Sequence, residues 1–179
     1  MSCPKDKSRL SQSKWLYFWS IKYIAVKTNP IEDDLLHLVT LRNRLAELGY
    51  ADPEYDEAED LLLEAEDAFN REHGAFLENL LQKLHEAHFP GQEVLLPTAY
   101  MAAVYRDSVV EEGAYELPMD EGILVDWELS DRSTRKAKLV LVPSPVRWML
   151  FDGEGMQCLW SMEEPDLFRT PHTNNAENQ

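Results

Sequence analysis

The chain has 179 residues, 44% of them hydrophobic and 10% aromatic, which is enough apolar material to bury the core of a single domain. Its 33 Asp and Glu outnumber its 17 Lys and Arg, so the formal net charge is −16. This composition excludes a chain that is disordered throughout. The two cysteines make neither a disulfide framework nor a zinc-ligand spacing, and no apolar run approaches the ~20 residues of a membrane-spanning helix. We therefore expect a cytoplasmic protein.

The charge is divided unevenly along the chain. Residues 1–29 hold six Lys and Arg against one Asp, a net charge of +5, and form what we call the basic aromatic arm. Within it, aromatic and β-branched residues alternate from Trp15 to Val26, which favours an extra strand, although a helix also fits. Three roles stay open for the arm: docking on its own acidic body, binding a partner through Trp15 and Trp19, or touching nucleic acid or a membrane surface.

Residues 30–91 hold 16 acids and four bases and show helical signals. Asn29 and Pro30 are typical of an N-cap and a first helical residue, and leucines follow at three- and four-residue steps. The same signal recurs at Asp52-Pro53, and Gly74 is interpreted as a helix end. Short connections make successive helices antiparallel, so we predict an acidic helical bundle. Its helices are expected over residues 30–48, 53–73 and 75–88.

Residues 92–162 begin with an expected helix over 97–110 and then change to a period of two. Turn signals such as Pro143-Ser144-Pro145 separate four alternating stretches. The predicted fold class is therefore α+β: an N-terminal antiparallel helical bundle followed by a four-stranded antiparallel β-meander covered by helices, with 30–91 and 92–162 as one compact unit. Residues 163–179 lack periodicity and are expected to form a disordered tail.

A resemblance covers residues 97–160. There a helix precedes a strand with a Pro-x-x-Asp-Gly-Gly-hydrophobic-x-x-Glu-Trp pattern and a meander whose hairpin holds Asp-Gly, and the segment resembles uncharacterised proteins of bacterial and phage mobile loci. The chain departs from the pattern with Glu121 for the first Gly and Asp126 for the Glu, and with one residue instead of two between Pro118 and Asp120. The resemblance implies no known activity, only a gene neighbourhood of toxin–antitoxin or defence systems. The matching residues are Pro118, Asp120, Gly122, Ile123, Asp126, Trp127, Asp152 and Gly153.

Catalytic signals are weak, and we assign no catalytic residue, metal ligand or cofactor. The serines lack a nucleophile elbow, and the seven glycines form no phosphate-binding loop. The pairs Asp34 with His37 and His85 with His88 have a helical i, i+3 spacing that a bundle metal site would use. Chance carboxylate–histidine neighbours are expected among 33 acids, so a helical-bundle metalloenzyme stays a minor alternative.

The most acidic segment runs from Asp52 to Glu72 and holds ten acids against the single base Arg71. Like charges at three- and four-residue spacing cost a few tenths of a kcal/mol per pair, so they indicate either a solvated face or a partner that supplies positive charge. We predict a non-enzymatic accessory, inhibitor or immunity-type subunit that binds a basic protein and does not bind nucleic acid through its acidic face. The alternative is a DNA mimic. The predicted partner-binding residues are Glu57, Asp60, Glu64, Asp67, Trp15 and Trp19.

Overall fold

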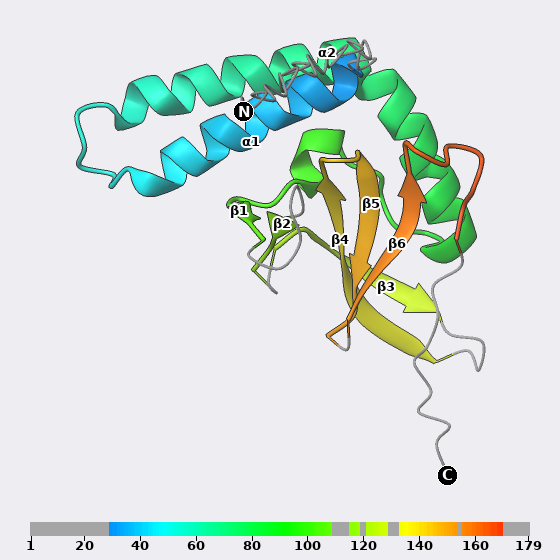
Figure 1. The fold of residues 1–179 in the computed structure, drawn as a ribbon. Coiled ribbons are helices and arrows are strands. Elements are labelled where there is room, and N and C mark those ends of the chain that lie inside the picture. Colours follow the sequence, from blue (N-terminus) through cyan, green and yellow to red (C-terminus); the bar gives the residue numbers. More distant parts are fainter. Residues whose placement is uncertain (1–28, 109–114, 119–120, 129–132, 154, 170–179) are drawn as a thin grey trace, which may run out of the picture.

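The computed structural model describes residues 29–108, 115–118, 121–128, 133–153 and 155–169. The fold is α+β: an antiparallel pair of helices is followed by a 3-10 turn, a small two-stranded sheet and a four-stranded antiparallel sheet (Figure 1). The elements are α1 (Pro30–Glu47), α2 (Tyr55–His88), η1 (Pro97–Tyr100), β1 (Arg106–Asp107), β2 (Tyr115–Glu116), β3 (Ile123–Glu128), β4 (Thr134–Val142), β5 (Arg147–Phe151) and β6 (Met156–Ser161).

Helix α1 begins where the sequence predicts. The Asn29 side chain accepts a hydrogen bond from the backbone N–H of Ile31 at 3.2 Å, and Pro30 occupies the first turn. Leu35, Leu38 and Val39 are buried on the side that faces α2 and η1. The helix ends at Glu47, one residue before the predicted boundary, and a short loop leads to α2. The two helices together form a hairpin that extends beyond the four-stranded sheet (Figure 1).

Helix α2 corrects the prediction of separate helices over 53–73 and 75–88. It is one helix of 34 residues that passes through Gly74 and changes direction along its length, so the helical part is a hairpin and not a bundle of three helices (Figure 1). A glycine ends a helix by taking a positive φ, and Gly74 is not among the glycines that do so. The residues after it, Ala75 to Leu77, continue the helix because Leu77 is fully buried in the core.

Replacing Gly74 with alanine is expected to raise the free energy of unfolding by about 0.5–1 kcal/mol, because glycine is the more costly residue inside a helix. A Cβ at this position would meet only ordinary contacts, Glu78 Oε1 at 3.5 Å and Asn70 Cβ at 4.0 Å. Urea unfolding measures the change. The mirror substitution at the exposed Ala75, Ala75→Gly, should lower stability by a similar amount. A loss of stability in Gly74→Ala would mean that the bend of α2 needs glycine.

The predicted helix over 97–110 is also corrected. Among the described residues of this range, 97–108, only the four residues Pro97–Tyr100 are helical, as a 3-10 turn, and the chain then forms a parallel bridge from Met101 to Leu141 of β4. The Tyr105 hydroxyl accepts a hydrogen bond from Ala102 N–H at 2.9 Å and donates one to the Leu141 carbonyl at 2.7 Å. These contacts hold the backbone extended where the sequence pattern indicated a helix.

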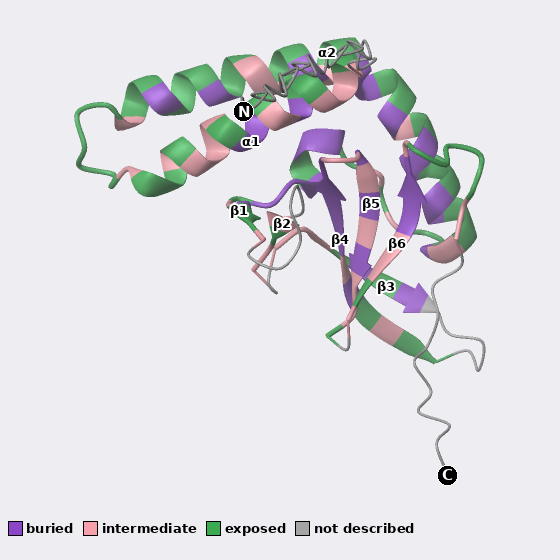
Figure 2. Ribbon diagram, in the orientation of Figure 1, coloured by how far each residue is buried: buried purple, intermediate pink, exposed green. Residues whose placement is uncertain are grey.

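The four-stranded meander is confirmed, with strand order β3-β4-β5-β6 and antiparallel pairing throughout. A register irregularity lies between Trp148 and Met149 of β5. Alternate residues face the core, and Figure 2 shows that buried residues predominate toward the ends of β4 and β6 and alternate with half-buried residues in β5. On the edge strand β3, the Gln92 side-chain amide bonds both the N–H and the carbonyl of Asp126, at 2.9 and 2.7 Å, and so occupies hydrogen-bonding groups that a further strand would use.

One hydrophobic cluster runs from α1 to β6. It joins the second half of α2, represented by Leu77, Leu81 and Leu84, to sheet residues such as Trp148 and Trp160. Residues 163–169, predicted as the start of a disordered tail, instead pack beside β6: Arg169 N–H donates to the Leu159 carbonyl at 2.8 Å, and Phe168 lies against the cluster. The arm strand predicted over 15–26 and residues 170–179 lie outside the described residues.

Candidate partner-binding site

The predicted acidic residues of α2 lie on one exposed face of the helix. Helical steps of three and four residues place them on the side opposite Ala58, Leu62 and Phe69, which are buried toward α1. Figure 2 shows exposed residues along this outer side of α2. We call it the acidic face, and its members, all exposed, are Glu57, Asp60, Glu64 and Asp67. The other two predicted residues, Trp15 and Trp19, lie outside the described residues.

Among the residues that the structure describes, no ion pair joins the four acids of the acidic face to a cation, although Arg71 lies one helical turn after Asp67 on α2. Three other acids of the hairpin are paired: Glu66 binds Arg42, Glu54 binds Arg44 at 3.1 Å, and Asp34 binds His73 at 2.7 Å. These three carboxylates have a partner within the fold, whereas the four on the outer side of α2 rely on solvent. The acidic face therefore carries four unpaired negative charges on one side of α2.

Two exposed leucines flank the acidic face. Leu61 is 41% exposed and Leu63 is 54% exposed, whereas Leu62 between them is buried. Leu61 lies one helical turn from both Glu57 and Glu64. Single exposed leucines are common on protein surfaces. Here they place apolar area beside unpaired charge, a combination that a protein partner can use for both contact and orientation.

A groove of about 440 Å³ lies between α1 and α2, beside the acidic face. We call it the hairpin groove. Its apolar lining comes from Leu38 of α1 and from Ala65, Ala68 and Phe69 of α2. Its polar lining comprises Asp34, His37, Arg71, Glu72 and His73, and Pro30 lines it at the beginning of α1.

The Asp34–His73 pair lies at this groove and was not predicted. His73 follows Phe69 by one turn on the stripe that faces α1, so its ring is only 7% exposed and its Nε2 lies 2.7 Å from Asp34 Oδ2. The sequence pattern had instead paired Asp34 with His37, its neighbour on α1. No signal within either helix could have selected His73, because the pairing depends on how the two helices are aligned.

The proposed bundle metal site is not assembled. Among the described residues, no group of three or more His, Cys, Asp or Glu side chains could hold a metal ion. The site required a third helix that folds back, so that His85 and His88 would approach Asp34. In the continuous α2, His85 lies twelve residues beyond His73, which corresponds to about 18 Å along the helix axis.

His85 takes part in a different, buried contact. Tyr100 Oη accepts a hydrogen bond from Leu95 N–H at 3.2 Å and lies 3.2 Å from His85 Nε2, so the hydroxyl donates to the neutral imidazole. Burial lowers the pKa of His85, opposed by a hydrogen bond that the ring donates to the Gln92 backbone, and burial raises the pKa of Tyr100. The pKa of His88 is also lowered by burial. These histidines support the fold in their neutral form.

Acid is therefore expected to destabilise the fold through His85 and His88. In the unfolded chain these histidines bind protons near the ordinary pKa of 6.5, whereas in the folded chain they bind protons only at lower pH. The contribution of the neutral histidines to stability is therefore complete above pH 6.5 and is lost as the pH falls. Urea unfolding between pH 8 and 5 should give a shallower decline in His85→Gln than in the native chain. The same substitution at the exposed His37 should leave the decline unchanged. Equal slopes in all three proteins would contradict this role for His85.

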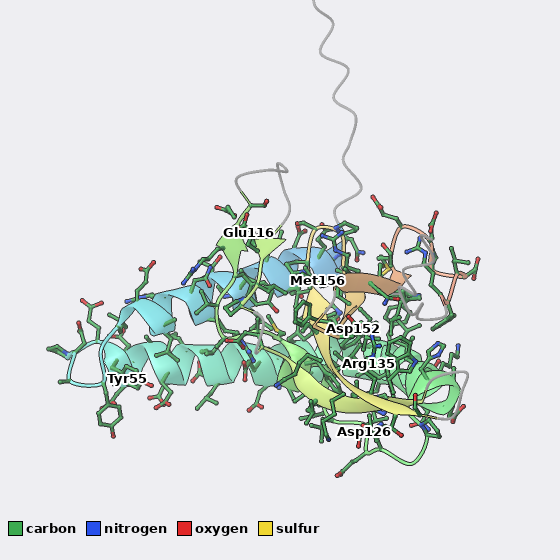
Figure 3. The ribbon with its side chains drawn as sticks, turned by 90° about the horizontal axis from the view of Figure 1, so that it is seen from below. Tyr55, Glu116, Asp126, Arg135, Asp152 and Met156 are labelled. Carbon is green, nitrogen blue, oxygen red and sulfur yellow. The ribbon has the colours of Figure 1, made fainter. Side chains whose placement is uncertain are left out.

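Three of the residues that carry the resemblance, Gly122, Trp127 and Asp152, have structural roles. Gly122 has φ +86° at the start of β3, and Trp127 is buried in the core. Asp152 and Arg135 form an ion pair of 3.2 Å across the sheet, shown together in Figure 3 on the opposite side of the molecule from Tyr55 at the hairpin end. Asp152 also accepts a hydrogen bond from Gly155 N–H, which closes the β5–β6 turn.

Comparisons with known proteins add no relative. No protein-family model, curated protein or solved structure matched the chain. The resemblance of residues 97–160 therefore stays a sequence pattern, and the argument for function depends on the hairpin and its surfaces.

Proposed function

We propose that the chain is a non-enzymatic binding protein, an accessory, inhibitor or immunity-type subunit, whose acidic face docks on a basic surface of a partner protein. The observation that carries the proposal is the row of Glu57, Asp60, Glu64 and Asp67 on one exposed side of α2, none of which forms an ion pair among the described residues. Complementary charge steers two proteins together and orients them, and it penalises partners of the wrong sign.

The shape of the molecule supports the same proposal. The hairpin extends beyond the sheet, so the outer side of α2 is open to a large partner along much of its length (Figure 1). Leu61 and Leu63 add exposed apolar surface on the two sides of the acidic face. The charged row is also sparse, with one carboxylate per ~4.5–6 Å of helix axis, whereas duplex DNA carries one charge per ~1.7 Å. That spacing favours a protein surface over the groove of a DNA-binding protein.

The cellular setting is part of the proposal. The resemblance of residues 97–160 to proteins of mobile loci supports a partner encoded in a bacterial defence or toxin–antitoxin locus. The low cysteine content supports an encounter in the cytoplasm. Among the described residues, no helix is both long and apolar enough to cross a membrane.

The test compares two variants with equal changes in charge. The first neutralises the acidic face with Glu57→Gln, Asp60→Asn, Glu64→Gln and Asp67→Asn. The second neutralises four exposed acids elsewhere, with Glu47→Gln, Glu93→Gln, Glu163→Gln and Asp166→Asn. A partner captured from the native host by the unaltered chain is identified and purified, and its Kd is measured for all three proteins by calorimetry.

Loss of four complementary charges is expected to weaken the Kd at least tenfold, about 1.4 kcal/mol, while the control variant stays within threefold of the native chain. Raising the salt from 50 to 300 mM should weaken the native complex and bring it close to the neutralised variant. Equal Kd values for the two variants would overturn the proposal. Displacement of the partner by duplex DNA, with a steep dependence on salt, would favour the DNA mimic instead.

A further inference from the structure

The hairpin groove is open at the point where the basic aromatic arm joins the fold. Pro30 lines the groove, and the described residues begin at Asn29, directly before it. Leu38, Ala65 and Ala68 give the groove an apolar surface. Its charged lining is Asp34, Glu72 and Arg71, two acids against one base, and Glu64 lies one turn from Ala68. An apolar groove with an excess of acids suits a segment that carries aromatic and cationic side chains together.

The arm has that composition. It carries six Lys and Arg against one Asp, the reverse of the hairpin, which has 16 acids and four bases over residues 31–91. Lys14 and Lys22 enclose the aromatic residues Trp15 and Trp19, and Lys27 lies three residues before Pro30. Because the arm is joined covalently to the groove, its effective concentration there is far higher than that of a free ligand.

We propose that residues 14–27 dock in the hairpin groove and along the acidic face, as an intramolecular ligand that competes with the basic partner. The competition rests on the proposed function, whereas the docking stands on its own. An extended segment of 14 residues reaches ~45 Å and a helical one ~21 Å, while the 18 residues of α1 span ~27 Å. Because α1 and α2 are antiparallel, a segment that turns back before Pro30 and follows α1 runs toward the beginning of α2. It therefore reaches the level of Glu64 in either conformation, and the level of Glu57 when it is extended.

Tryptophan fluorescence of the full chain can test the docking. Of the five tryptophans, Trp127, Trp148 and Trp160 are 4%, 0% and 0% exposed. Quenching by acrylamide, a neutral molecule, therefore reports mainly on Trp15 and Trp19. The double variant Trp15→Phe, Trp19→Phe gives the signal of the three core tryptophans, which is subtracted.

Two variants separate docking in the groove from other causes of shielding. Ala68→Arg places bulk and positive charge in the groove, and Ala87→Arg makes the same change at an exposed position near the end of α2, outside the groove. At low salt the native chain should shield Trp15 and Trp19, Ala68→Arg should raise their quenching constant at least twofold, and Ala87→Arg should leave it unchanged. Quenching as strong as that of free N-acetyltryptophanamide in the native chain, or no response to Ala68→Arg, would overturn the docking.

The competition has a separate measurement. Lys14→Glu, Lys22→Glu and Lys27→Glu, made together in the full chain, should release Trp15 and Trp19 and tighten the Kd for the partner at least threefold. Release of the tryptophans without a tighter Kd would overturn the competition and leave the docking in place. Shielded tryptophans in a chain that captures no basic partner would overturn the proposed function alone.

Discussion

Replacing Arg42 with methionine is expected to lower the free energy of unfolding by about 3–5 kcal/mol, the largest loss we expect from a single side chain of the hairpin. The Arg42 guanidinium binds Glu66 of α2 and donates to the carbonyls of Thr98, Met101 and Ala102, at 2.9 to 3.1 Å. Both charged side chains are largely buried, 15% and 19% exposed. Methionine keeps the packing of the aliphatic part but leaves a carboxylate and three carbonyls without their donor.

The matched control is Arg44→Met, two residues later on the same helix. Arg44 also pairs with an acid of the hairpin, Glu54 at 3.1 Å, but their side chains are 47% and 64% exposed. An exposed pair of this kind contributes about 0–1 kcal/mol. Urea unfolding, followed by circular dichroism, should therefore separate the two variants by at least 2 kcal/mol. Similar losses of stability in the two variants would mean that burial does not account for the contribution of Arg42.

Arg42 also shows which features a single sequence can predict. The start of α1 and the strands of the meander were predicted because their signals are local: Asn29 caps its own helix, and alternation within β4 fixes which residues face the core. The partners of Arg42 lie 24 to 60 residues away in the chain, so no spacing within α1 identifies them. Its position among leucines was the one available signal, because a charge there needs a buried partner.

The corrected helices have similar causes. Tyr100, Met101, Val104 and Tyr105 fit a helical stripe, but Met101 and Tyr105 contact Leu141, and those contacts end the helix at Tyr100. Gly74 suggested a helix end, yet the burial of the residues after it outweighs the cost of glycine. The acidic face was predictable for the opposite reason, since exposure and helical spacing are properties of α2 alone. The hairpin groove and the Asp34–His73 pair were not predictable, because they depend on the alignment of two helices.

Replacing Gly122 with alanine is expected to lower the free energy of unfolding by about 2–5 kcal/mol. Gly122 has φ +86°, a conformation that costs an L residue about 1–2 kcal/mol. In addition, a Cβ there would lie 2.6 Å from the Leu139 carbonyl oxygen and would overlap Val140 Cγ2, so β4 must move. Forced overpacking of this kind adds about 1–3 kcal/mol. The glycine thus permits β3 to begin against β4 without a gap.

Two other glycines separate the contributions of strain and overlap. Gly153 has the same φ of +86° but nothing within 4 Å of its added Cβ, so Gly153→Ala should cost only the ~1–2 kcal/mol of strain. Gly49 has neither a positive φ nor a neighbour within 4 Å, so Gly49→Ala should change stability little. We expect the loss of stability to increase from Gly49 through Gly153 to Gly122. A loss in Gly122→Ala no greater than in Gly153→Ala would show that β4 yields without cost, and that the close approach of the strands is not what this glycine provides.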